Sequence, residues 1–274
     1  MDRSDGLPSD QLSILLEELR QSRKYRGVSV EVALRALNWA AARQNRPDRI
    51  LKTAKRKLHQ IYGAFCGSDG YNKIDKLLDR LTDEINDAAV KTACRSILRI
   101  SPSTRERMDY LDKIYSTIFS AMGMPRTILD IACGLTPFSR PWMPISPDVH
   151  YAGLDIEAGQ IRLINRFFAQ RGYAGRGMEA DILTGQIEPV DLAFLFKALP
   201  SLEQQEKGAG SRLLADLPAD VIVVSFPAQS LGGRDKGMRG NYDRYMDQLT
   251  SGFAGGITRW EFPTETFYLI KRKC

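Results

Sequence analysis

From Gly123 onward, short apolar runs alternate with amphipathic stretches, and this alternation constrains the fold more than any other feature. The runs are rich in β-branched or aromatic residues and bounded by turn residues, at 127–132, 149–154, 192–196 and 221–226. Amphipathic stretches with helical spacing lie between them, at 158–171 and 202–214. Strands that alternate with helices favour an α/β fold with a parallel, doubly wound sheet.

The end of the chain has a different pattern. Residues 257–263 and 266–271 are two predicted strands with only Thr264 and Glu265 between them, so we expect a terminal antiparallel hairpin. A parallel sheet that ends in such a hairpin is typical of the class I S-adenosylmethionine-dependent methyltransferase (Rossmann-like) fold. We therefore expect that fold, preceded by an all-α N-terminal domain.

The first hundred residues are predicted to be helical. The apolar spacing indicates helices at 11–23, 30–43, 47–65, 71–82 and 87–100, with Ser29 as the N-cap of the second. Residues 67–70 are expected to form a loop, and one further helix is expected from Ser103 or Thr104 to Met122. We place the domain boundary at residue 102, which gives domains 1–102 and 103–274.

The positive charge of the chain is confined to this helical part. The whole net charge of +6 comes from residues 1–100, because residues 101–274 carry equal numbers of basic and acidic side chains. Residues 20–57 contain twelve basic residues and only two acidic ones, Glu31 and Asp48. Such a segment favours a polyanionic partner, although for any single residue a solvated surface is the alternative. The predicted phosphate contacts are Lys24, Arg26, Lys52, Lys55, Arg56 and Lys57.

Several classes of protein are disfavoured. The four cysteines include no CxxC pair and there are only two histidines, so we expect neither a metal site nor a disulfide framework. No stretch approaches the roughly 18 apolar residues of a membrane span. The first residues lack the apolar core of a secretory signal, and we expect a cytoplasmic protein.

A candidate cofactor loop follows the first predicted strand. Asp130, Ile131 and Ala132 are the last residues of this strand, and Cys133 and Gly134 come directly after it. In doubly wound sheets ligands bind at the carboxyl ends of the strands. Asp155 ends the second strand 21 residues after Gly134, where an acidic residue accepts hydrogen bonds from ribose hydroxyl groups.

The glycine content of the loop favours S-adenosylmethionine over a dinucleotide. A pyrophosphate needs several glycines, as in G-x-G-x-x-G, whereas this loop has only Gly134. Asp130 is then expected to face the amino-acid end of the cofactor. Asp181 follows the strand at 177–180, where the adenine amine is contacted in this fold. The alternative is that Cys133 and Gly134 form an ordinary tight turn.

At this point the chain resembles a known family, the aminoglycoside-resistance 16S rRNA (guanine(1405)-N7)-methyltransferases. The similar segments are spread in the family's order from about residue 20 to residue 245 and lie at 22–25, 58–65, 103–107, 130–137, 141–143, 196–203 and 225–238. Thr136 stands where the family pattern has Asn, and Phe138 where it has Leu. These two departures affect only the details of the cofactor contacts.

The resemblance implies a helical rRNA-binding domain before the methyltransferase domain. It implies methylation of N7 of guanine 1405 in helix 44 of 16S rRNA, within the 30S subunit, by a monomeric enzyme. The modification would give resistance to 4,6-disubstituted 2-deoxystreptamine aminoglycosides, and the cofactor product would be S-adenosyl-L-homocysteine. The expected cofactor contacts are Arg107, Asp130, Ala132, Gly134, Asp155, Asp181, Ile182, Phe196 and Lys197.

The residues after the fourth strand agree with N7 chemistry. Guanine N7 carries an in-plane lone pair and no proton, so catalysis rests on placing it in line with the methyl group and needs no general base. The chain lacks the Asn/Asp-Pro-Pro-aromatic motif that amino-directed enzymes carry there. Cys133 lies in the cofactor loop, and no other cysteine lies near this strand to serve as the nucleophile of a 5-methylcytosine enzyme. Lys197 is the candidate catalytic residue, with a solvated lysine as the alternative. Glu203 either faces the guanine or caps its own helix.

Base extrusion from the rRNA requires a basic clamp and stacking partners. Arg234 and Lys236 lie in a glycine-rich segment, 230–238, and are candidates for both catalysis and RNA binding; the alternative is a flexible surface loop. Tyr62 and Phe65 are either stacking residues or helix core. Two other functions stay open: methylation of an adenine N1 in the same rRNA helix, and a non-catalytic ribosome-binding factor.

Overall fold

The computed structural model describes residues 8–22, 25–62, 67–81, 86–183, 187–228, 238–253 and 255–272. Within these ranges the strands form one seven-stranded sheet with the order β3-β2-β1-β4-β5-β7-β6. The strands are β1 (Thr127–Ile131), β2 (His150–Asp155), β3 (Gly175–Glu179), β4 (Val190–Phe196), β5 (Ala219–Pro227), β6 (Ile257–Glu261) and β7 (Glu265–Lys271). Strands β1 to β5 run parallel to one another, whereas β7 is antiparallel to both β5 and β6. The predicted class I fold with its terminal hairpin is confirmed.

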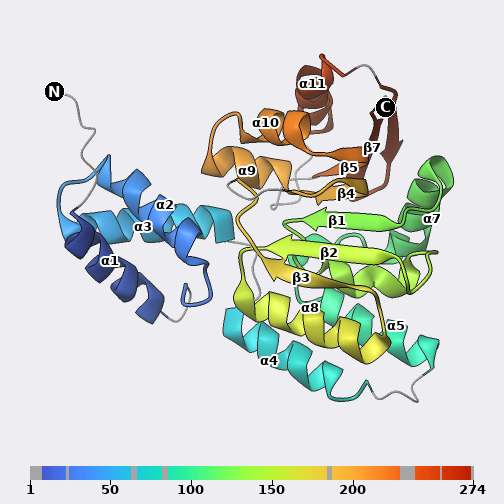
Figure 1. Ribbon diagram of the computed structural model, residues 1–274, viewed down its shortest axis with the longest axis horizontal. Coiled ribbons are helices and arrows are strands. Elements are labelled where there is room, and N and C mark those ends of the chain that lie inside the picture. Colours follow the sequence, from blue (N-terminus) through green and yellow to red (C-terminus); the bar gives the residue numbers. More distant parts are fainter. Residues whose placement is uncertain are drawn as a thin grey trace.

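Alternate residues of the strands face two separate cores. One core packs against α4 (Gly67–Leu78), α5 (Asp87–Leu98), α7 (Leu111–Met122), the 3-10 helix η2 (Thr136–Trp142) and α8 (Ala158–Arg171). The other packs against α9 (Leu199–Gln205), α10 (Ala209–Asp216) and α11 (Met238–Thr250). The sheet is therefore the middle of three layers, with α4 and α8 on one side and α10 and α11 on the other (Figure 1). Burial on both faces explains the continuous apolar runs of the central strands.

Three N-terminal helices have a core of their own. They are α1 (Ser9–Gln21), α2 (Val30–Ala41) and α3 (Pro47–Tyr62), and we call them the helical module. Ser29 is the N-cap of α2, as predicted, since its hydroxyl accepts a hydrogen bond from the Val32 amide. The helical module lies beside the edge of the sheet at which β1 and β2 end (Figure 1). It is thus placed next to the predicted ligand-binding edge.

The change from one hydrophobic core to the next comes before the predicted domain boundary at residue 102. Helices α4 and α5 share the core of the sheet, with Ile74, Leu78 and Cys94 fully buried there. The buried side chains of the helical module form a separate cluster, in which Leu58 is the last of the described members. We call everything from α4 to β7 the sheet module.

Four local predictions were wrong or incomplete. Residues 67–70 begin α4 instead of forming a loop, because Tyr71 and Ile74 draw the segment onto α8 and the sheet core. The single helix expected up to Met122 is divided into α6 (Pro102–Arg105), the 3-10 helix η1 (Met108–Tyr110) and α7. The stretch 202–214 is divided into α9 and α10 at Gly208, whose φ is +80°. Helix α11 was not predicted.

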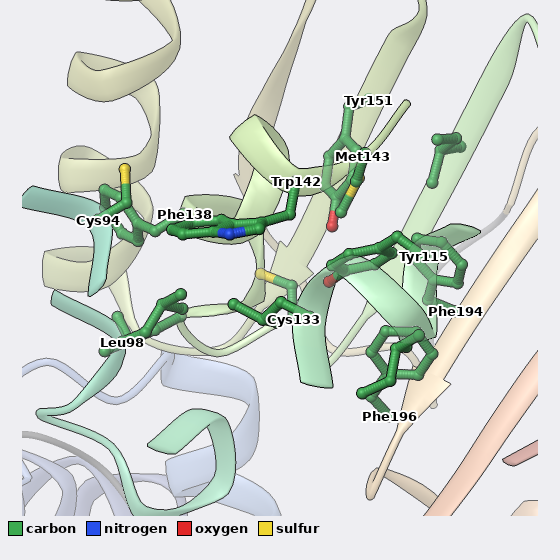
Figure 2. Close-up of a cluster of buried hydrophobic side chains, with 14 of the residues drawn as sticks. Cys94, Leu98, Tyr115, Cys133, Phe138, Trp142, Met143, Tyr151, Phe194 and Phe196 are labelled. Carbon is green, nitrogen blue, oxygen red and sulfur yellow. The ribbon is translucent and has the colours of Figure 1, made fainter. Parts of the chain in front are cut away.

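Bulky side chains fill the core beneath the candidate cofactor loop. Figure 2 shows Cys133 among the buried side chains of this cluster, together with Tyr115, Phe138 and Trp142. Burial raises the pKa of the Cys133 thiol well above its ordinary value of 9.0. A buried, protonated thiol is a poor nucleophile, which agrees with the expectation that cysteine takes no part in catalysis. No helix within the described ranges is long and apolar enough to cross a membrane.

Candidate functional site

The backbone is strained at two neighbouring points of the sheet. Ala132 follows β1 with φ of +53°, and Lys197 follows β4 with φ of +57°. These strands are paired at the centre of the sheet, where the strand order reverses. Left-handed backbone costs a non-glycine residue about 1–2 kcal/mol, and such residues cluster at functional sites. The strain therefore marks this edge as the candidate site.

Asp155 ties together the loops after β1 and β2. Its carboxylate accepts hydrogen bonds from the Gly134 amide at 2.9 Å and from the Ile156 amide at 2.8 Å. Gly134 has φ of +52°, a conformation that glycine adopts without strain. Burial raises the pKa of Asp155, while these backbone hydrogen bonds act in the opposite direction. The loop is thus organised around the carboxylate predicted to bind ribose.

Asp130 is buried with one oxygen lacking a protein partner. Its Oδ2 accepts a hydrogen bond from the Tyr151 hydroxyl at 2.6 Å, whereas Oδ1 has no hydrogen-bond partner among the described residues. Burial raises the pKa of Asp130 to about 7, against the opposing effects of Tyr151 and Arg107. An orphaned buried acceptor fits a cationic ligand group, such as the α-ammonium group of S-adenosylmethionine.

A mostly apolar pocket joins these strand ends. Asp155 and Asp181 lie at its wall, and Ser201 and Gln205 from α9 are its other polar side chains. The full lining is Ala132, Leu154, Asp155, Ile156, Ala180, Asp181, Ile182, Ala198, Ser201, Leu202 and Gln205. Apolar walls with a few polar groups suit an adenosine, so the residues present fit S-adenosylmethionine. The predicted contacts Ala132, Asp155, Asp181 and Ile182 are brought together here.

A buried ion pair supports the base of the site. Arg107 is 1% exposed, and its guanidinium donates to the fully buried Glu265 carboxylate through Nε at 3.1 Å and Nη2 at 2.9 Å. It also donates to Thr136 Oγ1 at 3.3 Å and lies 4.9 Å from the centre of the Phe196 ring. Arg107 thus joins the loop after β1 to the start of β7. Its predicted contact with the cofactor stays a prediction.

Lys197 is held between carboxylates and is not a solvated lysine. Its side chain is 12% exposed, and Nζ forms an ion pair with Glu106 and lies 3.6 Å from Glu265 Oε2. Its backbone amide donates to the carbonyl of Ser225 at 3.0 Å and to Ser225 Oγ at 3.1 Å. The ammonium group therefore has a defined position at the end of β4.

Sequence reasoning missed Glu265, Glu106 and Ser225 as parts of this site. Ser225 donates a hydrogen bond to Glu265, which makes this carboxylate the centre of the network. The available signal was an acidic residue directly before an apolar strand, since Glu265 begins β7. A buried acid usually has a cationic partner, but the sequence does not indicate which one.

Glu203 has a structural role in this geometry. Its two carboxylate oxygens accept hydrogen bonds from the Gly208 amide at 2.9 Å and from the Gly210 amide at 2.8 Å. These amides lie at the start of α10, so Glu203 caps that helix rather than its own. The structure thus supports a capping role, but for α10 and not for the helix that was predicted, and the catalytic role of Glu203 has no support from it.

The predicted RNA contacts differ in their surroundings. Arg26, Lys52 and Arg56 are exposed, and Lys55 is half-buried. Lys57 instead donates to the Gln204 carbonyl of α9 and lies 4.9 Å from the centre of the Trp39 ring. Burial, followed by the neighbouring Arg43 and Arg35, lowers its pKa. Lys24, Phe65, Arg234, Lys236 and the side chain of Tyr62 lie outside the described residues.

Comparisons with known proteins identify the family. The family described as ribosomal RNA methyltransferase (FmrO) matches residues 21–269. The 16S rRNA (guanine(1405)-N(7))-methyltransferase of Micromonospora echinospora is 35% identical over 97% of this chain and 98% of its own length. The protein of the same name from Micromonospora rosea is 35% identical over 96% of this chain and 97% of its own.

Solved structures give the same result. The 16S rRNA methyltransferase RmtF in complex with S-adenosyl-L-homocysteine has a TM-score of 0.86 and 31% identity, over 97% of this chain and 100% of that one. The 16S rRNA methylase RmtB has a TM-score of 0.80 and 29% identity, over 96% and 98%. With the fold, the strand-end carboxylates and near-complete coverage in agreement, this chain belongs to the ribosomal RNA methyltransferase family.

Proposed function

We propose that this protein transfers a methyl group from S-adenosylmethionine to N7 of guanine 1405 in helix 44 of 16S rRNA. The substrate is the 30S subunit, and the modification protects the ribosome from 4,6-disubstituted 2-deoxystreptamine aminoglycosides. The observation that carries the proposal is the strand-end pocket lined by Asp155 and Asp181, with Asp130 buried near the end of β1, in a chain whose relatives are named for this activity. Adenine N1 methylation and a non-catalytic ribosome-binding role are the alternatives that the experiments below test.

The residues of the chain act by positioning. When bound, S-adenosylmethionine supplies an electrophilic methyl group. Asp130 would hold its amino-acid end, Asp155 its ribose and Asp181 its adenine. Lys197, held by Glu106 and Glu265, places a fixed positive charge beside the pocket. Because N7 has no proton to lose, orienting N7 in line with the methyl group is sufficient for the reaction.

The helical module is the proposed rRNA-binding part. We place the boundary between α3 and α4, since α4 and α5 share the core of the sheet. The segment 20–57, with its net charge of +10, falls entirely within the helical module. One module thus binds the ribosomal RNA and the other transfers the methyl group. We propose that the enzyme works as a monomer in the cytoplasm.

Chemical cleavage of rRNA tests the proposed target directly. Cells that express the protein should yield 16S rRNA that borohydride and aniline cleave at nucleotide 1405, because N7-methylguanine is labile to this treatment. Primer extension locates the cleavage, and cells without the protein are the control. A reverse-transcription stop without chemical treatment at an adenine of the same helix would support the N1 alternative instead. Unmodified rRNA from cells that contain folded protein would support the alternative of a non-catalytic ribosome-binding role.

The affinity for S-adenosylmethionine should depend on pH through Asp130. With its pKa raised from 3.8 to about 7, the carboxyl is protonated below that pH and must lose its proton to pair with a cationic group. The dissociation constant should therefore fall as pH rises from 5.5 to 7.5, by at most about tenfold per pH unit. Calorimetry on Asp130→Asn should give weaker binding with most of this slope removed. An unchanged slope in the variant would contradict the role of Asp130.

The same shift has a consequence for folding. The native state holds the Asp130 proton more tightly than the unfolded chain does. This contribution to stability is fully present below about pH 3.8 and is lost as pH rises through about 7. Asp130→Asn should therefore gain stability relative to the wild type as pH rises across this range, which denaturant unfolding at a series of pH values measures.

Reversing two charges on α3 should weaken binding to the 30S subunit. The double substitution Lys55→Glu with Arg56→Glu changes the net charge by four on the proposed RNA-binding surface. Each lost phosphate contact should lower the salt slope of binding by about one unit, with little effect on affinity for S-adenosylmethionine. Filter binding at several salt concentrations measures the first quantity and calorimetry the second. A matched change on α4, Lys73→Glu with Lys76→Glu at exposed positions, is the control. Equal weakening by both pairs would argue against α3 as the contact surface.

A further inference from the structure

The helical module is joined to the wall of the cofactor pocket. Val28 and Glu157 form an isolated antiparallel bridge, and the Ser29 amide donates to the carbonyl of Ile156 at 3.2 Å. Ile156 and Glu157 directly follow Asp155 at the end of β2. The segment that leads into α2 therefore pairs with the loop that carries the proposed ribose contact.

Arg35 extends this junction to the adenine end of the pocket. It lies on α2, and its guanidinium binds the Asp181 carboxylate through Nη1 and donates to Gln205 Oε1 through Nη2 at 2.9 Å. The Asp181 side chain is 3% exposed and that of Arg35 is 28% exposed. Asp181 lies in the connection between β3 and β4, and Gln205 is the last residue of α9. Both belong to the sheet module and line the same pocket. One arginine of the helical module thus holds two of the polar groups in the pocket wall.

The geometry of a guanidinium makes this contact directional. The planar fork fixes the orientation of its partners, unlike the flexible ammonium group of a lysine. The second oxygen of Asp181, Oδ1, accepts a hydrogen bond from the Leu183 amide at 3.1 Å. The carboxylate is therefore held from two sides, by Arg35 and by its own loop. An oriented carboxylate discriminates between a hydrogen-bond donor and an acceptor on a bound base.

We propose that Arg35 is a positioning residue of the cofactor site, supplied by the helical module. It orients Asp181 so that this carboxylate recognises the 6-amino group of the cofactor's adenine. The proposal rests on the proposed function, since it takes Asp181 as the adenine contact. It assigns to the RNA-binding module a second task, which is to complete the adenine end of the cofactor pocket.

Two ligands that differ only at position 6 of the purine test the proposal. Calorimetry compares S-adenosylhomocysteine, which carries the 6-amino group, with S-inosylhomocysteine, which carries an oxo group there. The full-length wild type should prefer the adenosyl ligand by about tenfold or more. Arg35→Ala should reduce this ratio towards one, as Asp181→Asn should. The double variant should show no further loss, because both changes remove the same interaction.

The controls separate positioning from a general structural role. Arg46→Ala removes an exposed arginine of the same module that pairs only locally with Asp48, and it should leave the ratio unchanged. Arg35→Gln provides a second variant if Arg35→Ala unfolds, with thermal denaturation as the check. Equal weakening of both ligands, with the ratio preserved, would show a structural role for Arg35 and overturn the proposal.

The remaining outcomes distinguish the role of Arg35 from the proposed function. A ratio that Asp181→Asn removes and the Arg35 variants keep would overturn the role of Arg35 and leave the proposed function intact. A wild-type protein that binds both ligands equally well would overturn the proposal that Asp181 recognises the 6-amino group of the adenine. A folded wild type that binds neither ligand would overturn the proposed function itself.

Discussion

Replacing Glu265 by alanine is expected to lower the free energy of unfolding by about 3–5 kcal/mol. The substitution leaves the Arg107 guanidinium buried without its carboxylate, and an uncompensated buried charge is strongly destabilising. Arg107 and Glu265 are 1% and 0% exposed, and two hydrogen bonds join them. Urea denaturation of the wild type and of Glu265→Ala measures the difference in the free energy of unfolding. Because β7 lies between β5 and β6, the substitution should lower the stability of the whole sheet.

Glu261 offers a matched control in the same hairpin. It also pairs with arginines, Arg239 and Arg259, but all three side chains are substantially exposed. Exposed pairs contribute about 0–1 kcal/mol, so Glu261→Ala should cost far less than Glu265→Ala. Removing both charges, as in Arg107→Met with Glu265→Leu, should restore part of the stability, since no buried charge is left alone. Similar losses for Glu261→Ala and Glu265→Ala would contradict the importance of burial.

Replacing Lys197 by alanine is expected to lower the rate of methyl transfer by about 100-fold or more while the protein stays folded. Removing one preorganised electrostatic group from an active site typically has an effect of this size. The Nζ atom is held by Glu106, lies 3.6 Å from Glu265 Oε2 and donates to the carbonyl of Ser103 at 3.4 Å. Single-turnover methylation of 30S subunits measures the rate, and calorimetry measures S-adenosylmethionine affinity separately.

Two further lysine variants sharpen this test. Lys207→Ala removes an exposed lysine shortly after α9 and should have wild-type activity. Lys197→Gly should be as inactive as Lys197→Ala but more stable by about 1 kcal/mol, because glycine relieves the left-handed backbone at φ of +57°. Wild-type rates in folded Lys197→Ala would exclude a catalytic role for this residue.

The order of strands and helices was predictable because burial imposes a local pattern. Strands buried on both faces appear as short apolar runs, and α8 was predicted with its observed bounds, Ala158–Arg171. The offset between Gly134 and Asp155 was equally informative, since Gly134 lies in the loop after β1, Asp155 ends the paired strand β2, and the structure joins them by a hydrogen bond at 2.9 Å. Local spacing was sufficient wherever the interacting groups lie at predictable strand ends.

Prediction failed where distant segments decide the local structure. Residues 67–70, with two glycines, look like a loop, but the contacts of α4 with α8 outweigh their low helix propensity. The sequence leaves open whether Glu203 faces the guanine or caps its own helix, and only the position of Gly208 and Gly210 shows that it caps the next helix. The boundary placed at residue 102 followed the end of the helical pattern, whereas the packing follows the shared core.

The sequence by itself determined the class of fold, the strand-end carboxylates and the concentration of positive charge in the helical module. These depend on residues close together in the chain, or on strand ends that a parallel sheet brings to one edge. Only the tertiary structure decided which charges meet. Arg35 and Asp181 are 146 residues apart, and Arg107 and Glu265 are 158 residues apart. Pairing over such separations depends on how whole elements pack, and no local pattern of residues encodes it.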